Sequence, residues 1–189
     1  MKNFQKLIAV SMLAISITSC QKTPEASFTT DKSEYVAGET INLTNTTLNG
    51  KTYKWTFPDG QTGSSESYAF ETDDNDPAGT LTFRLEAFSS NGKKSDEVSK
   101  SVNIKAAEGD VVFWQEAGSG YGTTVVSLNS VTSNITTEYT SSPDCGASGC
   151  AVFNGLKVGT YNYAASDGTT NWSGTLTVTK NTCLKLKLN

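Results

Sequence analysis

Four cysteines, a short aspartate run and three tryptophans are the residues of this chain whose chemistry could indicate a function. The sequence has no histidine. Histidine-based acid–base catalysis, Ser-His-Asp triads and histidine-ligated metal sites are therefore excluded. What remains is thiol chemistry at Cys20, Cys145, Cys150 and Cys183, the oxygens of carboxylates, and the flat faces of indole rings.

The aspartate run suggests a calcium site, because carboxylate oxygens are ligands that calcium prefers. Its members are Asp73, Asp74 and Asp76. If an EF-hand loop started at Asp74, however, Ala78 and Leu85 would occupy ligand positions. We therefore expect a solvated turn and keep the three aspartates only as weak calcium candidates. No other metal and no cofactor is expected.

Trp114 and Trp172 are candidates for ligand binding, because sugar faces stack on indole rings. Trp172 follows a turn at the predicted start of a strand, where its side chain can project outward. Tryptophan is more often a core residue, and that interpretation stands beside the first for both positions. The glycine-rich segment 118–122 lacks the spacing of a phosphate-binding loop, and we expect a hairpin turn there between Trp114 and Val125.

The N-terminus has the pattern of an export signal. Lys2 and Lys6 precede an eleven-residue apolar run, Leu7–Ile17, which only two serines interrupt. A membrane-spanning helix needs about 20 apolar residues, so this run is too short to be a stable span. It is typical of the hydrophobic region of a secretory signal peptide, here residues 1–19.

The residues Ile17-Thr18-Ser19-Cys20 that end this run resemble the bacterial lipobox. The resemblance implies cleavage between Ser19 and Cys20 and acylation of Cys20. Ile17 and Ser19 are substitutes of similar size for the usual residues. Several acyl chains, each contributing about 0.8 kcal/mol per buried methylene, would anchor the protein to a membrane. The alternative is an ordinary signal peptide with an incidental cysteine.

The residues after Cys20 bear on the membrane to which the lipid would attach. Gln21 is not the aspartate that retains some lipoproteins in the inner membrane, so we expect an outer-membrane lipoprotein in the cell envelope. Gln21-Lys22 is similar to the start of a surface-export signal, but acidic residues do not follow in the usual number. Surface-exposed and periplasmic locations therefore both remain open. Residues 20–25 are expected to be the lipidated tether.

Behind the tether, the chain alternates apolar and polar residues in short runs separated by turn dipeptides. In the run 51–57, the side chains of Tyr53, Trp55 and Phe57 fall on one face. Asn49-Gly50 and Asn91-Gly92 are among the turn signals. Short strands at this spacing predict an all-β chain made of two tandem antiparallel β-sandwiches of immunoglobulin-like size.

Residues 26–105 resemble a PKD domain. The resemblance rests on the strand 36–46, on Tyr53-Lys54-Trp55-Thr56-Phe57-Pro58-Asp59-Gly60, and on the later strand 80–87 with the turn 90–92. Pro58 replaces the glycine that is usual in the family's motif. The resemblance implies a β-sandwich that serves as a spacer or binding module, and it places Trp55 in the core.

Residues 110–189 resemble prealbumin-like modules, such as the carboxypeptidase regulatory-like and Cna-B-type domains. The motif is a Gly-x-x-x-Phe-x-x-Leu-x-x-Gly-x-Tyr pattern over Gly149–Tyr161. The resemblance implies a stalk, scaffold or adhesion support. Ala106–Gly109 is the expected boundary between the two modules, which share no visible sequence repeat.

Export would place Cys145, Cys150 and Cys183 in an oxidising compartment, where one disulfide is expected and one thiol is left over. Cys183 begins the last predicted strand. A bridge to Cys183 would fix that strand to the module and contribute roughly 3–4 kcal/mol, whereas a Cys145–Cys150 bridge would close only a short loop. We expect a bridge to Cys183, with either of the other two cysteines as its partner.

The net charge of the chain and the size of its two modules narrow the classes of function that we expect. The net charge is −4, and removal of residues 1–19 leaves 13 basic and 19 acidic side chains, or −6. This balance argues against nucleic acid as a partner. Each module is barely large enough for its own core and has no long loops to build a cleft, so we expect no enzyme. Our first hypothesis is a non-catalytic scaffold or adhesion lipoprotein that binds an envelope or extracellular protein; the alternative is a glycan-binding lipoprotein for polysaccharide capture.

Overall fold

The structure is a computed structural model that describes residues 21–189, which contain fifteen strands and no helix. The all-β class expected from the sequence is confirmed. The first eight strands are β1 (Phe28–Thr30), β2 (Glu34–Val36), β3 (Thr40–Asn45), β4 (Thr52–Thr56), β5 (Thr62–Gly63), β6 (Tyr68–Glu71), β7 (Gly79–Phe88) and β8 (Ser95–Lys105). The remaining strands are β9 (Glu108–Gln115), β10 (Thr124–Leu128), β11 (Val131–Ile135), β12 (Ala151–Lys157), β13 (Gly159–Ser166), β14 (Asn171–Val178) and β15 (Cys183–Leu188).

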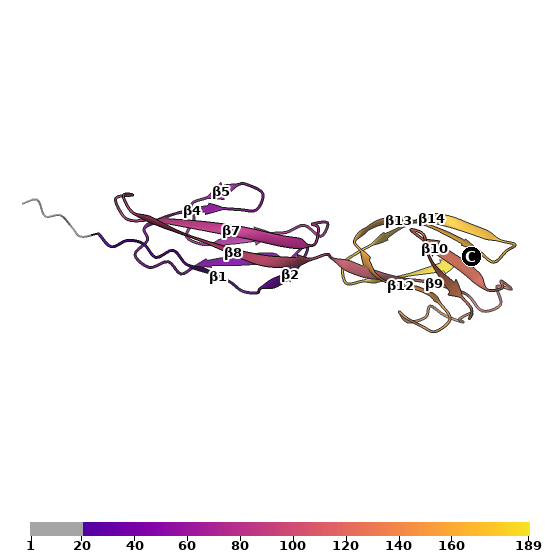
Figure 1. Ribbon diagram of the computed structural model, residues 1–189. Helices are drawn as coiled ribbons and strands as arrows, with labels where there is room; N and C mark the ends of the chain where they lie inside the picture. Colours follow the sequence, from indigo (N-terminus) through magenta and orange to yellow (C-terminus); the bar gives the residue numbers. More distant parts are fainter. Residues whose placement is uncertain (1–20) are drawn as a thin grey trace, which may run out of the picture.

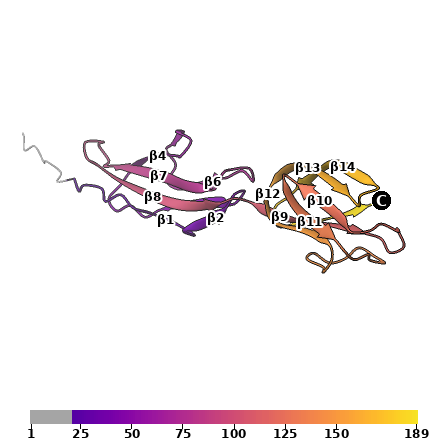
Figure 2. The ribbon, with the colours of Figure 1, turned by 45° about the vertical axis from the view of Figure 1, so that its right-hand side comes forward.

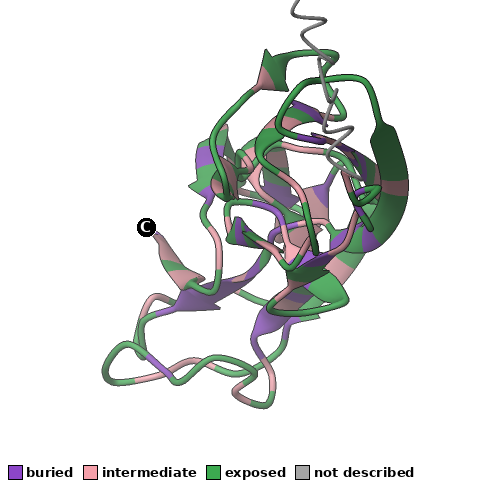
Figure 3. Ribbon diagram, turned by 90° about the vertical axis from the view of Figure 1, so that its left-hand side faces the viewer, coloured by how far each residue is buried: buried purple, intermediate pink, exposed green. Residues whose placement is uncertain are grey.

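The strands form two β-sandwiches that lie end to end (Figure 1). In the N-terminal sandwich, the sheets β1-β3-β6 and β2-β8-β7-β4-β5 enclose one hydrophobic core. In the C-terminal sandwich, the sheets β11-β10-β13-β14 and β12-β9-β15 enclose a second core. A view turned by 45° shows the same division (Figure 2), and a view turned by 90° shows buried segments inside the molecule and exposed segments around them (Figure 3).

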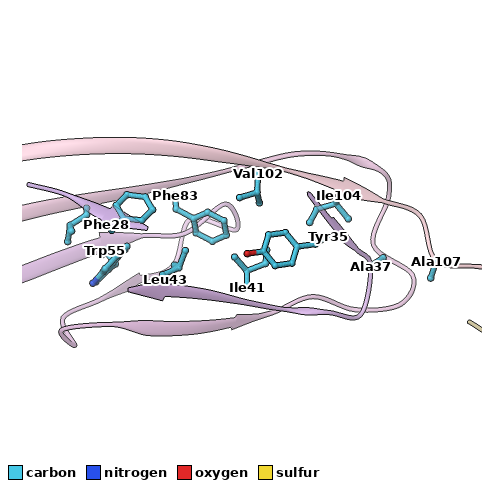
Figure 4. Packing of buried hydrophobic residues seen from close by; sticks show 11 residues of the cluster. Phe28, Tyr35, Ala37, Ile41, Leu43, Trp55, Phe83, Val102, Ile104 and Ala107 are labelled. Carbon is cyan, nitrogen blue, oxygen red and sulfur yellow. The ribbon is translucent and has the colours of Figure 1, made fainter. Parts of the chain in front are cut away.

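Alternating side chains build the N-terminal core, as the sequence pattern predicts. Trp55 on β4 is fully buried, and its ring meets that of Phe28 edge-on at 5.0 Å between centroids. The indole nitrogen Nε1 of Trp55 donates a hydrogen bond to the carbonyl oxygen of Ser65 at 3.0 Å. Burying a large aromatic ring with its polar atom satisfied stabilises the fold strongly. Figure 4 shows the surrounding cluster of buried side chains.

Two of the turn dipeptides that the sequence predicts, Asn49-Gly50 and Asn91-Gly92, contain residues with the left-handed backbone of a turn. Gly92 has a φ of 69° in the hairpin that joins β7 to β8, and the two strands pair without a break from Phe88–Ser95 to Gly79–Ile104. Asn49 also has a left-handed backbone, with a φ of 58°. Glycine and asparagine adopt this conformation at low cost, which explains why they occupy these positions.

The two sandwiches are joined by short connections. Only Ala106 and Ala107 separate β8 from β9, and Ala107 packs in the N-terminal core. Val158 also packs against that core, and its amide donates a hydrogen bond to the carbonyl of Ala107 at 3.0 Å. Lys180 donates to the carbonyl oxygen of Ala37 and lies 3.6 Å from the carboxylate of Asp74. These contacts restrict the angle between the sandwiches.

We expect Lys180→Ala to loosen this junction, because it removes the two polar contacts that Lys180 makes with the N-terminal sandwich. Small-angle scattering should show a broader distribution of interatomic distances, with the melting temperature little changed. Lys105→Ala is the matched control, since its ion pair with Glu34 lies within the N-terminal sandwich. A scattering profile identical to that of the wild type would contradict this role for Lys180.

Candidate functional site

A disulfide joins Cys145 to Cys183 in the C-terminal sandwich. The two Cα atoms are 6.3 Å apart, and 38 positions separate the cysteines in sequence. The structure thus has the expected bridge to Cys183 and gives Cys145 as its partner. A disulfide between these residues indicates an oxidising compartment outside the cytoplasm.

The bridge holds residues 136–150, here termed the covering segment, against the outer face of the sheet β12-β9-β15. A third hydrophobic cluster forms between them, with Val112, Trp114 and Cys150 at its centre. The amide of Tyr139 in the covering segment donates a hydrogen bond to the carbonyl of Gln115 at 2.9 Å. Both faces of β9 are therefore buried, one in the main core and one under this segment.

Trp114 lies under the covering segment with only 7% of its surface exposed. The ammonium of Lys187 sits 5.8 Å from the ring centroid, and the indole Nε1 is buried without a hydrogen-bond partner among the described residues. A sugar cannot stack on a ring covered in this way. The expectation that Trp114 offers a ligand-binding face is corrected, and the core interpretation holds for it. Its continuous apolar run, Val111–Trp114, was the signal for burial on both faces.

Among residues 21–189, Cys150 is the free cysteine, and it is buried in the same cluster. Burial raises the pKa of its thiol, because the thiolate is poorly solvated there. The thiolate is the reactive form of cysteine, so this environment makes Cys150 a packing residue rather than a nucleophile.

The expected hairpin between Trp114 and Val125 is wrong. β9 pairs with β12 and β15, whereas β10 pairs with β11 and β13, so the glycine-rich segment 118–122 crosses between the two sheets. Glu138 holds this crossing: it accepts hydrogen bonds from the hydroxyl of Ser119 at 2.6 Å and the amide of Gly118 at 2.8 Å. The same two bonds lower the pKa of Glu138. A carboxylate held against this loop does not suit a phosphate.

The aspartate run forms a turn, as expected. The carboxylate of Asp73 accepts hydrogen bonds from the amide of Asn75 at 2.9 Å and from its side chain at 2.8 Å, and these lower the pKa of Asp73. Asp76 caps the amide of Asp73 at 2.9 Å, and Asp74 faces Lys180. Within residues 21–189, no group of three or more histidine, cysteine, aspartate or glutamate side chains is arranged to hold a metal.

Trp172, on β14, is partly buried and lines a shallow groove with a volume of about 380 Å³. Its Nε1 donates a hydrogen bond to the backbone oxygen of Asn189 at 2.7 Å, and its ring meets that of Tyr121 edge-on at 4.9 Å. The ring packs against the core of the C-terminal sandwich, on the side of β14 opposite to the outward side chains of Asn171 and Ser173. The other lining residues are Val125, Ser127, Ala164, Ala165, Ser166, Asn171 and Ser173. Of the two tryptophan candidates, only Trp172 lines this groove, and its side chain packs against the core instead of projecting outward.

The candidate lipidation and cleavage residues, Cys20 and Ser19, lie outside the described residues. No helix in residues 21–189 has the length and apolarity needed to cross a membrane.

Comparison with known proteins gives structural likenesses only. No family model and no curated protein matches the chain. Among solved structures, the PKD1 domain of Vibrio anguillarum Epp is similar, with 19% identity over 46% of this chain and 98% of that domain and a TM-score of 0.37. A carbohydrate-binding module of the β-sandwich superfamily has 16% identity over 76% of this chain and 55% of its own, with a TM-score of 0.42. BcpA, the major pilin subunit of Bacillus cereus, has 12% identity over 88% of this chain and 70% of its own, with a TM-score of 0.38.

Loss of the disulfide should destabilise the C-terminal sandwich and uncover Trp114. For Cys145→Ala, we expect a loss of about 3–4 kcal/mol in the free energy of unfolding, because the bridge closes a loop of intermediate length. Denaturant titration gives the energy, and quenching of tryptophan fluorescence by acrylamide reports the exposure. Cys150→Ala is the control that removes a thiol but no bridge, and it should leave Trp114 shielded. Equal quenching in wild type and Cys145→Ala would contradict the role of the bridge in holding the covering segment.

Proposed function

We propose that this protein is an exported, lipid-anchored, non-catalytic binding protein of the bacterial outer membrane. Cys20 is its acylated N-terminal residue after removal of residues 1–19. The PKD-like module 26–105 acts as a spacer, and the prealbumin-like module 110–189 acts as the binding head. The end-to-end arrangement of the sandwiches supports this division, because it holds the second one away from the tether.

The observation that carries the proposal is the free edge of β14. This eight-residue strand lies at the end of the sheet β11-β10-β13-β14 and contains no charged residue and no proline. It pairs with β13 without a bulge, from Gly159–Val178 to Ser166–Asn171. Proteins usually protect such edges with charges, prolines, bulges or short strands.

Other sheet edges among residues 21–189 show those protections. β1, β2 and β5 have two or three residues each, β6 carries Glu71, β12 carries Lys157, and β15 carries Lys185 and Lys187. β11 is uncharged, but a hydrogen bond from the amide of Val152 to the hydroxyl of Ser133 ties it to β12. The unprotected edge of β14 therefore suits a specific partner.

The backbone groups that β14 offers can be assigned. The amide of Asp167 bonds to the carbonyl of Thr170 in the turn that joins β13 to β14. Hydrogen-bonded pairs alternate along an antiparallel ladder, so the backbone groups of Ser173, Thr175 and Thr177 point to the free edge. An extended segment of a partner protein can add to this edge as a further strand.

We expect Thr175→Pro to abolish partner binding with the fold intact, because proline removes an edge donor that the β13 ladder does not use. The measurement is cross-linking of the lipoprotein to envelope proteins in cells, followed by the dissociation constant of the identified pair. Thr175→Val is the matched control: it changes the side chain and keeps the amide. Unimpaired binding by Thr175→Pro would refute strand addition at this edge.

The anchor has its own test. We expect Cys20→Ala to prevent incorporation of labelled palmitate and to release the chain from the membrane fraction, because the acylated thiol is lost. The proportion of protein in the soluble fraction measures this. Cys150→Ala should remain in the membrane fraction. Continued membrane attachment of Cys20→Ala would refute lipid anchoring through this cysteine.

A second candidate function is polysaccharide capture. It is supported by the groove over β10, β13 and β14, which combines small polar side chains with the apolar Val125 and Ala164. The glycan would then occupy the face of this sheet, whereas a protein partner would occupy its edge.

A further inference from the structure

The sheet β11-β10-β13-β14 contains no aspartate, glutamate, lysine or arginine on any of its four strands. The strand register separates its two sides, because alternate residues such as Val126, Ala165 and Leu176 point into the core. The remaining side chains form an outward surface that we term the neutral face. It consists of Val125, Ser127, Thr132, Asn134, Thr160, Asn162, Ala164, Ser166, Asn171, Ser173, Thr175 and Thr177.

The neutral face differs from the outward face of the large N-terminal sheet. That face carries Lys54, Arg84, Glu86 and Glu97, as is usual for a sheet surface in water. The charged residue nearest to the neutral face in sequence is Asp167 in the β13–β14 turn. Its carboxylate accepts hydrogen bonds from the amides of Thr169 and Thr170, at 2.8 and 2.6 Å. The neutral face therefore lacks the charges that the outward face of the large N-terminal sheet carries.

The polar groups of the neutral face have capacity for a ligand. Ser166 accepts a hydrogen bond from the amide of Gly168, but no hydrogen bond within the described residues involves the side chains of Ser127, Asn171 or Ser173. These three side chains line the groove together with the apolar Val125 and Ala164. The groove thus presents hydroxyl and amide groups around small apolar patches.

We propose that the neutral face binds an uncharged polysaccharide lying across the strands. This inference rests on the second candidate function and gives it a ligand class and a site. A sugar ring presents C–H patches and hydroxyl groups, which match the apolar and polar side chains of the groove. Its lack of charge matches a face that offers no partner for a carboxylate, sulfate or phosphate.

The size and composition of the face favour a polymer over other ligands. Four strands span about 14 Å, which is more than one sugar ring covers. Protein interfaces depend on aromatic, methionine and arginine anchors, and the outward positions of this face contain none. Nucleic acid needs lysine or arginine to neutralise its phosphates. A neutral, hydroxyl-rich chain is the ligand that this surface fits.

The test is affinity electrophoresis of the mature chain from residue 20, with Cys20→Ser, in gels containing neutral or acidic polysaccharides. Retardation is expected with at least one neutral polymer, such as a glucan, mannan or xyloglucan, and not with polygalacturonate or alginate. Ala164→Glu places a charge and bulk at the centre of the face, between Ser127 and Ser173, and should weaken binding by about tenfold or more. Ser101→Glu adds the same charge to the exposed outer face of the N-terminal sandwich and should bind like the wild type.

The outcomes separate this site from the functions on which it rests. If no neutral polymer retards the wild type, both glycan capture and the neutral-face site are refuted, whereas strand addition at β14 is judged by Thr175→Pro alone. If a glycan binds but Ala164→Glu binds equally well, capture stands and the neutral face is not its site. Stronger retardation by acidic polymers overturns the inference. Dimerisation of the wild type that Ala164→Glu abolishes, seen by analytical ultracentrifugation, also overturns it, since the face would then bind a second copy.

Discussion

The bond between Cys145 and Cys183 determines which surface of the C-terminal sandwich is open. Cys183 begins β15, which pairs in parallel with β9, and Cys145 belongs to the covering segment. The bond therefore fixes that segment over the outer face of β12-β9-β15 and buries Trp114 and Val112. A sheet with apolar side chains on both faces is stable in water only if both faces are covered. The sheet β12-β9-β15 is thus covered on both faces, whereas the outward face of β11-β10-β13-β14 is exposed to solvent.

The two sheets of the C-terminal sandwich therefore differ in what they expose. The exposed sheet ends at β14, whose outer edge has free backbone groups, and its face is uncharged. The protected edges of the opposite sheet carry Lys157, Lys185 and Lys187, which make additional strand pairing costly. Under the proposed functions, a partner would therefore bind on this side of the module, by pairing at the edge or by contact on the face. The sequence leaves a protein and a glycan open as ligands. On this sheet, the proposed protein partner would bind at the edge of β14 and the proposed glycan on the face.

Local patterns predicted the N-terminal sandwich well because they are determined by short-range physics. The alternation of Tyr53, Trp55 and Phe57 sets the buried face of β4, and Gly92 supplies the left-handed turn that a hairpin requires. The segment 118–122 has similar turn residues but joins two sheets. Its neighbours pair with distant strands, and local chemistry does not encode that choice. The partner of Cys183 was hidden for the same reason, since it depends on where residues 136–150 fold back, whereas the apolar run Val111–Trp114 did signal the burial of Trp114. The neutral face can be identified once the strand register is known, because the absence of charged residues from its four strands is visible in the sequence.

Anchoring on a membrane changes what a weak site can achieve. Serine, threonine and asparagine side chains on an open face form few contacts per sugar, and each hydrogen bond gained replaces one to water, so its net contribution is about 1 kcal/mol. A single neutral face would therefore release its ligand readily. Under the proposed function, several lipid-anchored copies facing one polymer would bind it together, and the effective concentration of each further site would strengthen binding without any new contact. The contacts that Lys180 makes between the sandwiches support this arrangement, because a restricted junction holds each face at a similar distance from the tether. Weak individual sites, presented by several anchored copies on a spacer of restricted orientation, would hold a long polymer and still let it slide, as the proposed function requires.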